Sequence, residues 1–144
     1  LHFSGRGIRN GNSTLWGSWI ISSKSLNAYF SGDGGYSETF KELGNKFGSF
    51  DIAFIENGAY NVDWSNVHMY PDEAVQANID LKSSVLFPIH WSKFDLSIHP
   101  WDEPIIRITK EAAKKNVNLA TPMIGEVFEL GNIPKKSWWE KLRY

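Results

Sequence analysis

The sequence contains no cysteine, and this absence excludes both a disulfide framework and any metal site built from thiolates. A metal ion in this protein would therefore be held by His, Asp and Glu side chains. The lack of cysteine also fits a cytoplasmic protein. No apolar run reaches the ~18 residues needed to span a bilayer, and no stretch resembles a signal peptide.

An excess of charge of one sign is missing as well. The 15 Lys and Arg residues and the 16 Asp and Glu residues are interspersed and give a net charge of −1. A nucleic-acid-binding surface would need a basic patch that neutralises phosphates, so no nucleic-acid partner is predicted. An initiator Met is also missing, and residues 1–3 read as the middle of a strand. We therefore expect the chain to be a segment of a longer protein.

Aromatic residues are abundant, at 15% of the chain with seven Trp, which predicts a well-packed or ligand-lining interior. The 144 residues suffice for one domain with a real core, and no repeat, low-complexity tract or linker divides them. We expect one unit over residues 1–144.

The pattern of apolar residues predicts alternating strands and helices. Strands are expected at 14–22, 27–31, 51–55 and 84–89, with a turn over 22–25 that makes the first two a hairpin. Helices are expected at 37–47, from 71 to about 82, and from 102 to about 116. Short strands at 118–122 and 126–130 follow. This order predicts an α/β layered domain.

Three apolar residues are expected to face inward from each predicted helix. They are Phe40, Leu43 and Phe47 in the first, Val75, Ile79 and Leu81 in the second, and Ile105, Ile108 and Ala112 in the third.

Asp33 lies among glycines directly after the apolar strand at 27–31. Glycine lets the chain reverse and lets the backbone approach a ligand closely, so a carboxylate in this place is typical of a metal ligand or a catalytic acid. The alternative is an ordinary turn in which Asp33 bonds only to its local backbone.

Three histidines fall, like Asp33, at or just after the ends of predicted elements: His2, His68 and His90. Ligands gather at strand ends in α/β sheets, and three imidazoles with one carboxylate form a plausible set for zinc, manganese or iron. Each histidine also has a plain structural interpretation. His90 before Trp91 reads as a half-buried residue, His68 as a capping or surface residue, and His99 as a surface or structural residue.

Seven segments resemble, in order and spacing, the C-terminal half of metallo-β-lactamase superfamily hydrolases. The branch that these segments resemble contains the N-acyl-phosphatidylethanolamine-hydrolysing phospholipase D and its bacterial relatives. The segments are HFSGRG at 2–7, TLWGSW at 14–19, FSGDGGY at 30–36, KFGSFD at 46–51, GAY at 58–60, HMYPDEAV at 68–75 and IHW at 89–91. The resemblance runs from residue 1 to about 126.

This resemblance implies a four-layer αβ/βα sandwich with a dinuclear site, usually of zinc, at one edge of its two sheets. It makes His2 a ligand of the first metal, Asp33 the carboxylate that bridges both metals and takes part in catalysis, and His90 a ligand of the second metal. His68 becomes a catalytic residue that does not bind metal and that contacts a phosphoryl oxygen or transfers a proton. Arg6 becomes a phosphate contact, with a solvated loop arginine as its alternative.

The chain also departs from the family pattern. The central signature His-x-His-x-Asp-His, which supplies four further ligands, is absent. We therefore expect only the C-terminal half of the sandwich, with the missing N-terminal half of the same protein as its partner. Gly34 replaces a common Thr, and Glu56 with Asn57 replaces a more apolar pair, which puts a lipid substrate in doubt.

The predicted function is that of part of a dizinc hydrolase that acts on a phosphodiester or a related ester, either a small molecule or a lipid. This chain alone is expected to be inactive. Two alternatives stay open: a lactonase or other small-ester hydrolase, and a metal-free binding or structural module. Half of a sandwich exposes a sheet face, so an apolar patch or a self-pairing homo-oligomer is expected.

Overall fold

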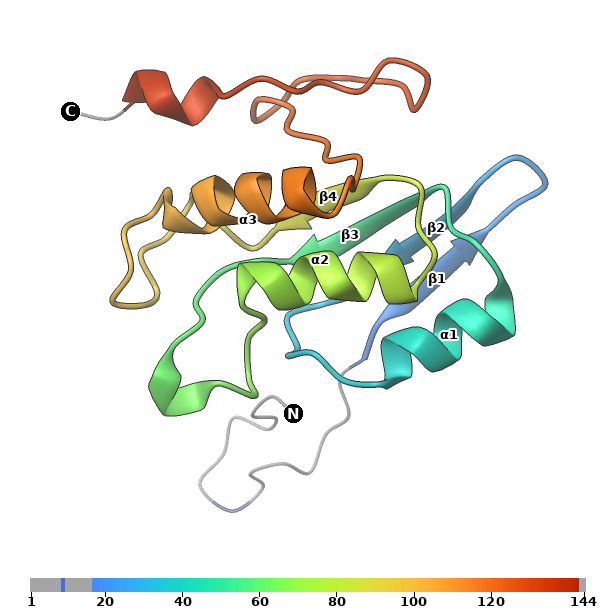
Figure 1. Cartoon of the computed structure of the whole chain (residues 1–144), viewed down its shortest axis with the longest axis horizontal. Coiled ribbons are helices and arrows are strands. Elements are labelled where there is room, and N and C mark those ends of the chain that lie inside the picture. Colours follow the sequence, from blue (N-terminus) through green and yellow to red (C-terminus); the bar gives the residue numbers. More distant parts are fainter. Residues whose placement is uncertain (1–8, 10–16, 143–144) are drawn as a thin grey trace.

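The structure is a computed structural model that describes residue 9 and residues 17–142. Strands and helices alternate along most of the chain (Figure 1). The strands are β1 (Trp19–Ser22), β2 (Asn27–Phe30), β3 (Ile52–Glu56) and β4 (Leu86–Ile89). The helices are α1 (Thr39–Phe47), α2 (Pro71–Asp80) and α3 (Glu103–Lys114), and the short 3₁₀ helices are η1 (Val62–Trp64) and η2 (Trp138–Leu142). The predicted α/β layered domain is confirmed.

The four strands form one sheet in the order β1-β2-β3-β4. β1 and β2 are the antiparallel hairpin that the sequence predicts. β2, β3 and β4 run parallel, and the chain crosses between them through α1 and α2. The carboxyl ends of these three strands therefore lie at the same edge of the sheet.

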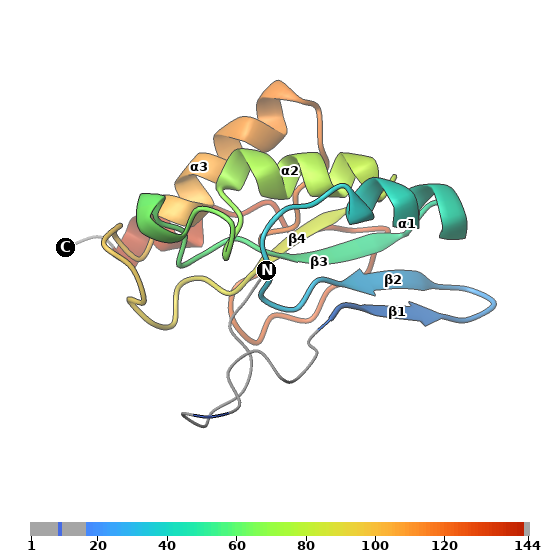
Figure 2. The same cartoon turned by 90° about the horizontal axis from the view of Figure 1, so that it is seen from below.

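All three helices cover one face of the sheet, as Figure 2 shows. Tyr29, Ala53, Ile55 and Leu86 point from the strands into this layer. The inward faces of α2 and α3 are confirmed for all predicted residues except Ile79, which is 40% exposed. The predicted inward face of α1 is also wrong at Phe47, since the helix ends at this residue and leaves it exposed.

The opposite face of the sheet carries a second, smaller core. Ala28, Ile52 and Val85 lie there with Ala120, and Phe128 and Ile133 from the C-terminal segment pack against them. This segment does not reach β1, where Trp19 is 70% exposed and Ile21 is 62% exposed. The register pairs these two residues with Phe30 and Ala28, so an apolar surface on this face faces solvent.

The C-terminal region contains less regular structure than the sequence predicts. The segment at 118–122 joins the sheet edge only through a bridge between Leu86 and Leu119. The segment at 126–130 is not a strand, and it forms only a bridge between Glu129 and Asn132. Within the described part of the chain, no helix combines the length and the apolar character that crossing a membrane requires.

Gly44 of α1 packs closely against the backbone at the end of α2. A Cβ at this position would overlap the Asp80 carbonyl oxygen and lie 3.0 Å from Leu81 Cα. An alanine in a helix normally stabilises it by ~1 kcal/mol relative to glycine. We expect Gly44→Ala instead to lower the free energy of unfolding by ~1–3 kcal/mol, because the two helices must separate.

Urea denaturation measures this effect. Lys41→Ala, at an exposed position of the same helix, is the matched control and should change stability by less than ~0.5 kcal/mol. A stabilised Gly44→Ala protein would contradict the close packing of α1 on α2.

Candidate functional site

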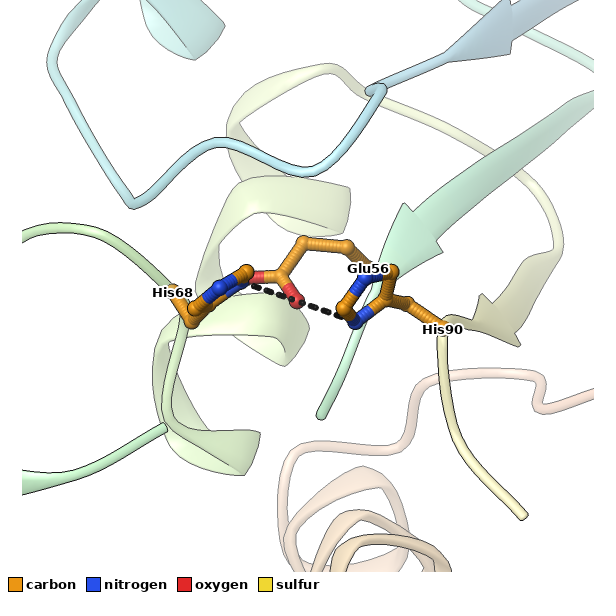
Figure 3. A group of neighbouring side chains, drawn as sticks. All are labelled: Glu56, His68 and His90. Atoms are coloured by element: carbon orange, nitrogen blue, oxygen red, sulfur yellow. Dashed lines mark ion pairs between the residues drawn. The ribbon is translucent and has the colours of Figure 1, made fainter. Parts of the chain in front are cut away.

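Three polar side chains meet at the carboxyl edge of the parallel strands (Figure 3). Glu56 is the last residue of β3, His90 follows β4, and His68 lies in the loop before α2. Nδ1 of His68 lies 3.5 Å from Glu56 Oε2, and Nδ1 of His90 lies 3.8 Å from the same oxygen. The imidazole rings stack with centroids 5.1 Å apart. We call these three residues the carboxyl-edge cluster.

The Glu56 side chain is completely buried, with 0% of its surface exposed. A buried carboxyl group requires hydrogen-bond donors to offset the loss of water. The backbone N–H of Met69 donates to Oε1, and the backbone N–H of Gly58 donates to Oε2 at 3.3 Å. Glu56 therefore ties the loop after β3 to the start of α2.

His90 is positioned by a tight turn at the end of β4. Its backbone φ is 66°, a left-handed conformation that a residue other than glycine adopts only when its surroundings hold it there. The adjacent Trp91 donates from its indole N–H to Pro88 O at 3.0 Å and stacks on Trp138 with centroids 5.4 Å apart. Gly58 also packs against this turn, since a Cβ there would overlap the His90 carbonyl oxygen.

His68 is held by the loop that joins β3 to α2. Asn61 caps η1 through a bond from Asp63 N to its Oδ1 at 3.1 Å, and Trp64 donates from its indole N–H to Ala59 O at 2.7 Å. Glu73 begins α2 by accepting from Tyr70 N at 2.8 Å. His68 precedes this helix start and is buried.

Tyr60 of the GAY motif anchors the same loop to α3. Its hydroxyl donates to Glu103 Oε1 at 3.0 Å, and Arg107 lies over its ring at 5.2 Å. Burial, together with this bond to Glu103, raises the pKa of Tyr60. His99 stacks on Tyr60 with centroids 4.4 Å apart, which agrees with its predicted structural role.

Asp33 lies in the loop that follows β2, at the same edge of the sheet, and is half-buried. Two contacts fix this loop near the cluster. Ser31 Oγ accepts from Glu56 N at 2.9 Å, and a Cβ at Gly35 would overlap the backbone of Asn66, two residues before His68. The glycine-rich turn is thus a close contact between two loops of the candidate site.

Tyr36 closes the same glycine-rich turn. Its hydroxyl donates to Asp80 Oδ2 at 2.6 Å, and this bond raises the pKa of Tyr36 to about 12. The loop that carries Asp33 is therefore also tied to the end of α2.

The structure brings together two of the predicted site residues, His68 and His90, and adds Glu56. Among the described residues, the ligand atoms of these three lie within 4.8 Å of one another, and Asp33 is not part of that group. His2 and Arg6 lie outside the described residues. The ligand set of His2, Asp33 and His90, the catalytic roles of Asp33 and His68, and the phosphate contact of Arg6 all stay predictions.

Sequence reasoning missed Glu56 as a site residue. The signal was present, because an acidic residue directly closes the apolar strand 52–55, as Asp33 closely follows β2 and His90 follows β4. The rule that singled out those two positions applies equally to Glu56.

Comparison with protein families identifies the chain's relatives. The family model described as the beta-lactamase superfamily domain matches residues 1–91. An uncharacterised protein of Mycobacterium tuberculosis is 41% identical over 142 residues, which cover 96% of this chain and 38% of that protein. The N-acyl-phosphatidylethanolamine-hydrolyzing phospholipase D 1 of Caenorhabditis elegans is 30% identical over 136 residues, covering 89% of this chain and 38% of that protein. The chain thus spans 38% of the length of each relative.

Two solved structures share the fold. The metallo-β-lactamase fold protein YhfI of Bacillus subtilis superposes with a TM-score of 0.54 at 18% identity, over 71% of this chain and 39% of that chain. A metallo hydrolase of Ignicoccus hospitalis superposes with a TM-score of 0.57 at 19% identity, over 74% of this chain and 42% of that chain. The metallo-β-lactamase fold expected from the sequence motifs is confirmed.

The contact between Gly58 and His90 gives a second prediction. We expect Gly58→Ala to lower the free energy of unfolding by ~1–3 kcal/mol, because the added Cβ forces the His90 turn away from Glu56. Thermal or urea unfolding measures it. Gly131→Ala is the control, since a Cβ there meets no atom within 4 Å. If Gly58→Ala is as stable as Gly131→Ala, the His90 turn moves to accommodate the added Cβ without a loss of stability, which contradicts the prediction.

Proposed function

Because the chain belongs to the β-lactamase superfamily, we propose that it forms part of a metal-dependent hydrolase that cleaves a phosphodiester or a related ester. The observation that carries this proposal is the meeting of His68, Glu56 and His90 at one edge of the sheet, beside the Asp33 loop. Histidine and carboxylate groups that converge at strand ends suit a divalent cation.

The donor chemistry fits zinc. The chain has no cysteine, and the proposed ligands His90 and Asp33 supply an imidazole nitrogen and a carboxylate oxygen, both of which zinc accepts. We propose that His90 binds metal through Nε2, since Nδ1 faces Glu56. Asp33 is proposed as the bridging carboxylate, because its two oxygens carry separate lone pairs. His2 is the proposed third ligand of this chain, and two zinc ions are the proposed cofactors.

A bound divalent cation supplies a Lewis acid for the reacting oxygen and a water of lowered pKa at neutral pH. The residues of this chain then orient the substrate and move protons. His68 is proposed to act from beside the metal ligands, where its imidazole accepts a proton from the reacting water and passes it to a leaving-group oxygen. Arg6 is proposed to contact the phosphate.

The proposed substrate class is a phosphodiester or a closely related ester. The name of the C. elegans relative supports a phosphodiester, at 30% identity over 89% of this chain. A panel of chromogenic phosphodiesters and lactones separates the two ester classes, because a preference for lactones would place the protein among small-ester hydrolases. A cytoplasmic location stays a prediction from composition alone.

We propose further that the exposed sheet face is covered by another part of the same protein. The face carries Trp19 and Ile21 on β1, each more than half exposed, beside the half-exposed Phe30 on β2. Contiguous apolar surface of this kind marks an interface. The relatives extend well beyond the aligned region, since the chain covers only 38% of each, so they contain enough further chain to form a second layer.

Replacing the proposed bridging carboxylate tests the metal-dependent function. We expect Asp33→Asn in the intact protein to reduce turnover of a chromogenic phosphodiester more than the ~10–100-fold typical of residues that act through a ligand. Bound zinc, measured by atomic emission, should fall in the same variant because an amide is a poorer ligand than a carboxylate.

Asp63→Asn, an exposed carboxylate in the η1 loop, is the control and should leave turnover and zinc content unchanged. Near-normal hydrolysis by Asp33→Asn would reject the bridging role. A wild-type protein that binds no metal would instead favour a metal-free binding module.

A lysine on the exposed sheet face tests the proposed second layer. We expect Ile21→Lys to destabilise the intact protein by more than ~2 kcal/mol, because a covered charge loses its hydration. Val62→Lys replaces an aliphatic residue of η1 that is 79% exposed, against 62% for Ile21, and should cost less than ~0.5 kcal/mol.

Thermal unfolding at several protein concentrations measures both variants. A loss of stability that depends on protein concentration would place a second copy of the chain on this face, as in a homo-oligomer. If both variants change stability by less than ~0.5 kcal/mol, the sheet face is exposed to solvent in the intact protein, and the proposed second layer is refuted.

A further inference from the structure

Glu56 is the one acidic residue of an otherwise apolar strand, and its placement calls for a physical reason. The other residues of β3 are apolar, and Glu56 is as fully buried as Ile55 beside it. Burial of a carboxyl group costs several kcal/mol unless donors surround it. An aliphatic residue would close this strand at no such cost, so the carboxyl group serves contacts that an aliphatic residue cannot make.

Both oxygens of Glu56 already accept hydrogen bonds from the backbone. Met69 N donates to Oε1 and Gly58 N donates to Oε2. These two donors come from opposite ends of the β3–α2 loop and fix the plane of the carboxyl group. A carboxyl group held in this way is a rigid acceptor.

The two imidazoles present the same atom to this acceptor. Nδ1 of His68 and Nδ1 of His90 both face Oε2, at 3.5 Å and 3.8 Å (Figure 3). In neutral imidazole one nitrogen carries the proton and the other accepts, and an acceptor beside Nδ1 favours the tautomer with the proton on Nδ1. The Nε2 atoms, on the far side of each ring, then keep their lone pairs.

We propose that Glu56 is a positioning residue that fixes the tautomer and the orientation of both His68 and His90, so that each ring presents an unprotonated Nε2 away from the strand. The proposed function is needed only to say what these nitrogens contact, namely a metal ion at His90 and the reacting group at His68. The tautomers are inferred from the contacts with Glu56 alone. A carboxylate behind a ligating histidine raises its basicity and fixes its orientation.

The rival interpretation makes Glu56 a direct ligand, in a site with His68 and His90. The backbone donors argue against it, because each carboxyl oxygen already accepts an N–H and the side chain is wholly buried. The experiment below separates the two roles by the number of ions bound.

The direct test needs no substitution. Long-range ¹⁵N–¹H correlation spectra of the intact, metal-depleted protein report which imidazole nitrogen carries the proton. We expect both His68 and His90 to be protonated at Nδ1. A proton on Nε2 of either residue in this spectrum would overturn the proposal for that residue.

A variant then tests whether Glu56 causes the preference. A Gln amide accepts on one side only, so Glu56→Gln cannot receive both backbone donors and the two imidazoles. We expect the Nδ1–H tautomer to be lost at one or both histidines. Glu73→Gln is the matched control, since its carboxyl group also accepts a backbone N–H beside the cluster, from Tyr70 at the start of α2. Unchanged tautomers in Glu56→Gln would overturn the proposal.

Cobalt titration gives a readout that a structural role alone would not move. Glu56→Gln should bind Co²⁺ about 10–100-fold more weakly with an unchanged number of ions, because the ligating ring is less well held. Loss of one whole ion would make Glu56 a ligand and overturn the positioning role. Failure of the wild-type protein to bind Co²⁺ would refute the proposed function, while the metal-free spectra still decide the role of Glu56.

Glu56→Asp provides a second test in case Glu56→Gln does not fold. It keeps a carboxyl group but shortens it by one methylene, so it should retain the Nδ1–H tautomers in at least one histidine and bind Co²⁺ more tightly than Glu56→Gln. A Glu56→Asp protein that folds and behaves like Glu56→Gln would overturn the requirement for a carboxyl group.

Discussion

The parallel register of β2, β3 and β4 is the constraint on which the candidate site depends. It pairs Ala28 with Ile52 and Glu56 with Ile89, so that three strands end at the same edge of the sheet. Residues that follow these strands are separated by more than twenty positions in the chain but emerge side by side. A change of register by one residue would turn Glu56 to the other face and separate it from both histidines.

Close backbone approaches make this edge precise. Gly58 packs against the His90 turn, and Gly35 packs against the loop before His68. In both places a side chain would have to overlap a backbone atom of the neighbouring loop, so the loops interlock without side chains between them. The imidazoles therefore have little freedom, which is what a site that must hold reacting groups within a fraction of an ångström needs.

The sequence predicted most of the elements, because apolar periodicity reports which residues a core requires. It did not predict that Ile79, near the end of α2, is 40% exposed, nor that the segment at 126–130 is irregular, with Phe128 packed on the sheet and Val127 94% exposed. His68 and His90 were singled out from their places at element ends. Their pairing through Glu56 depends on spatial contacts that no local pattern encodes.

Sequence patterns alone do not identify Glu56 as a site residue, for a physical reason. Periodicity and propensity describe what stabilises the fold, and by that standard an acid at the end of IAFI is an inconsistency. Natural proteins keep residues that destabilise an element mainly where a functional site requires them, and contacts with the surrounding structure offset the loss of stability. Here the compensation is visible in the two backbone donors that solvate the carboxyl group in place of water. Because those donors offset the cost of burial, Glu56 Oε2 can also face the Nδ1 atoms of His68 and His90. The acidic residue that is least typical of a buried strand is therefore the one that links the two histidines of the site.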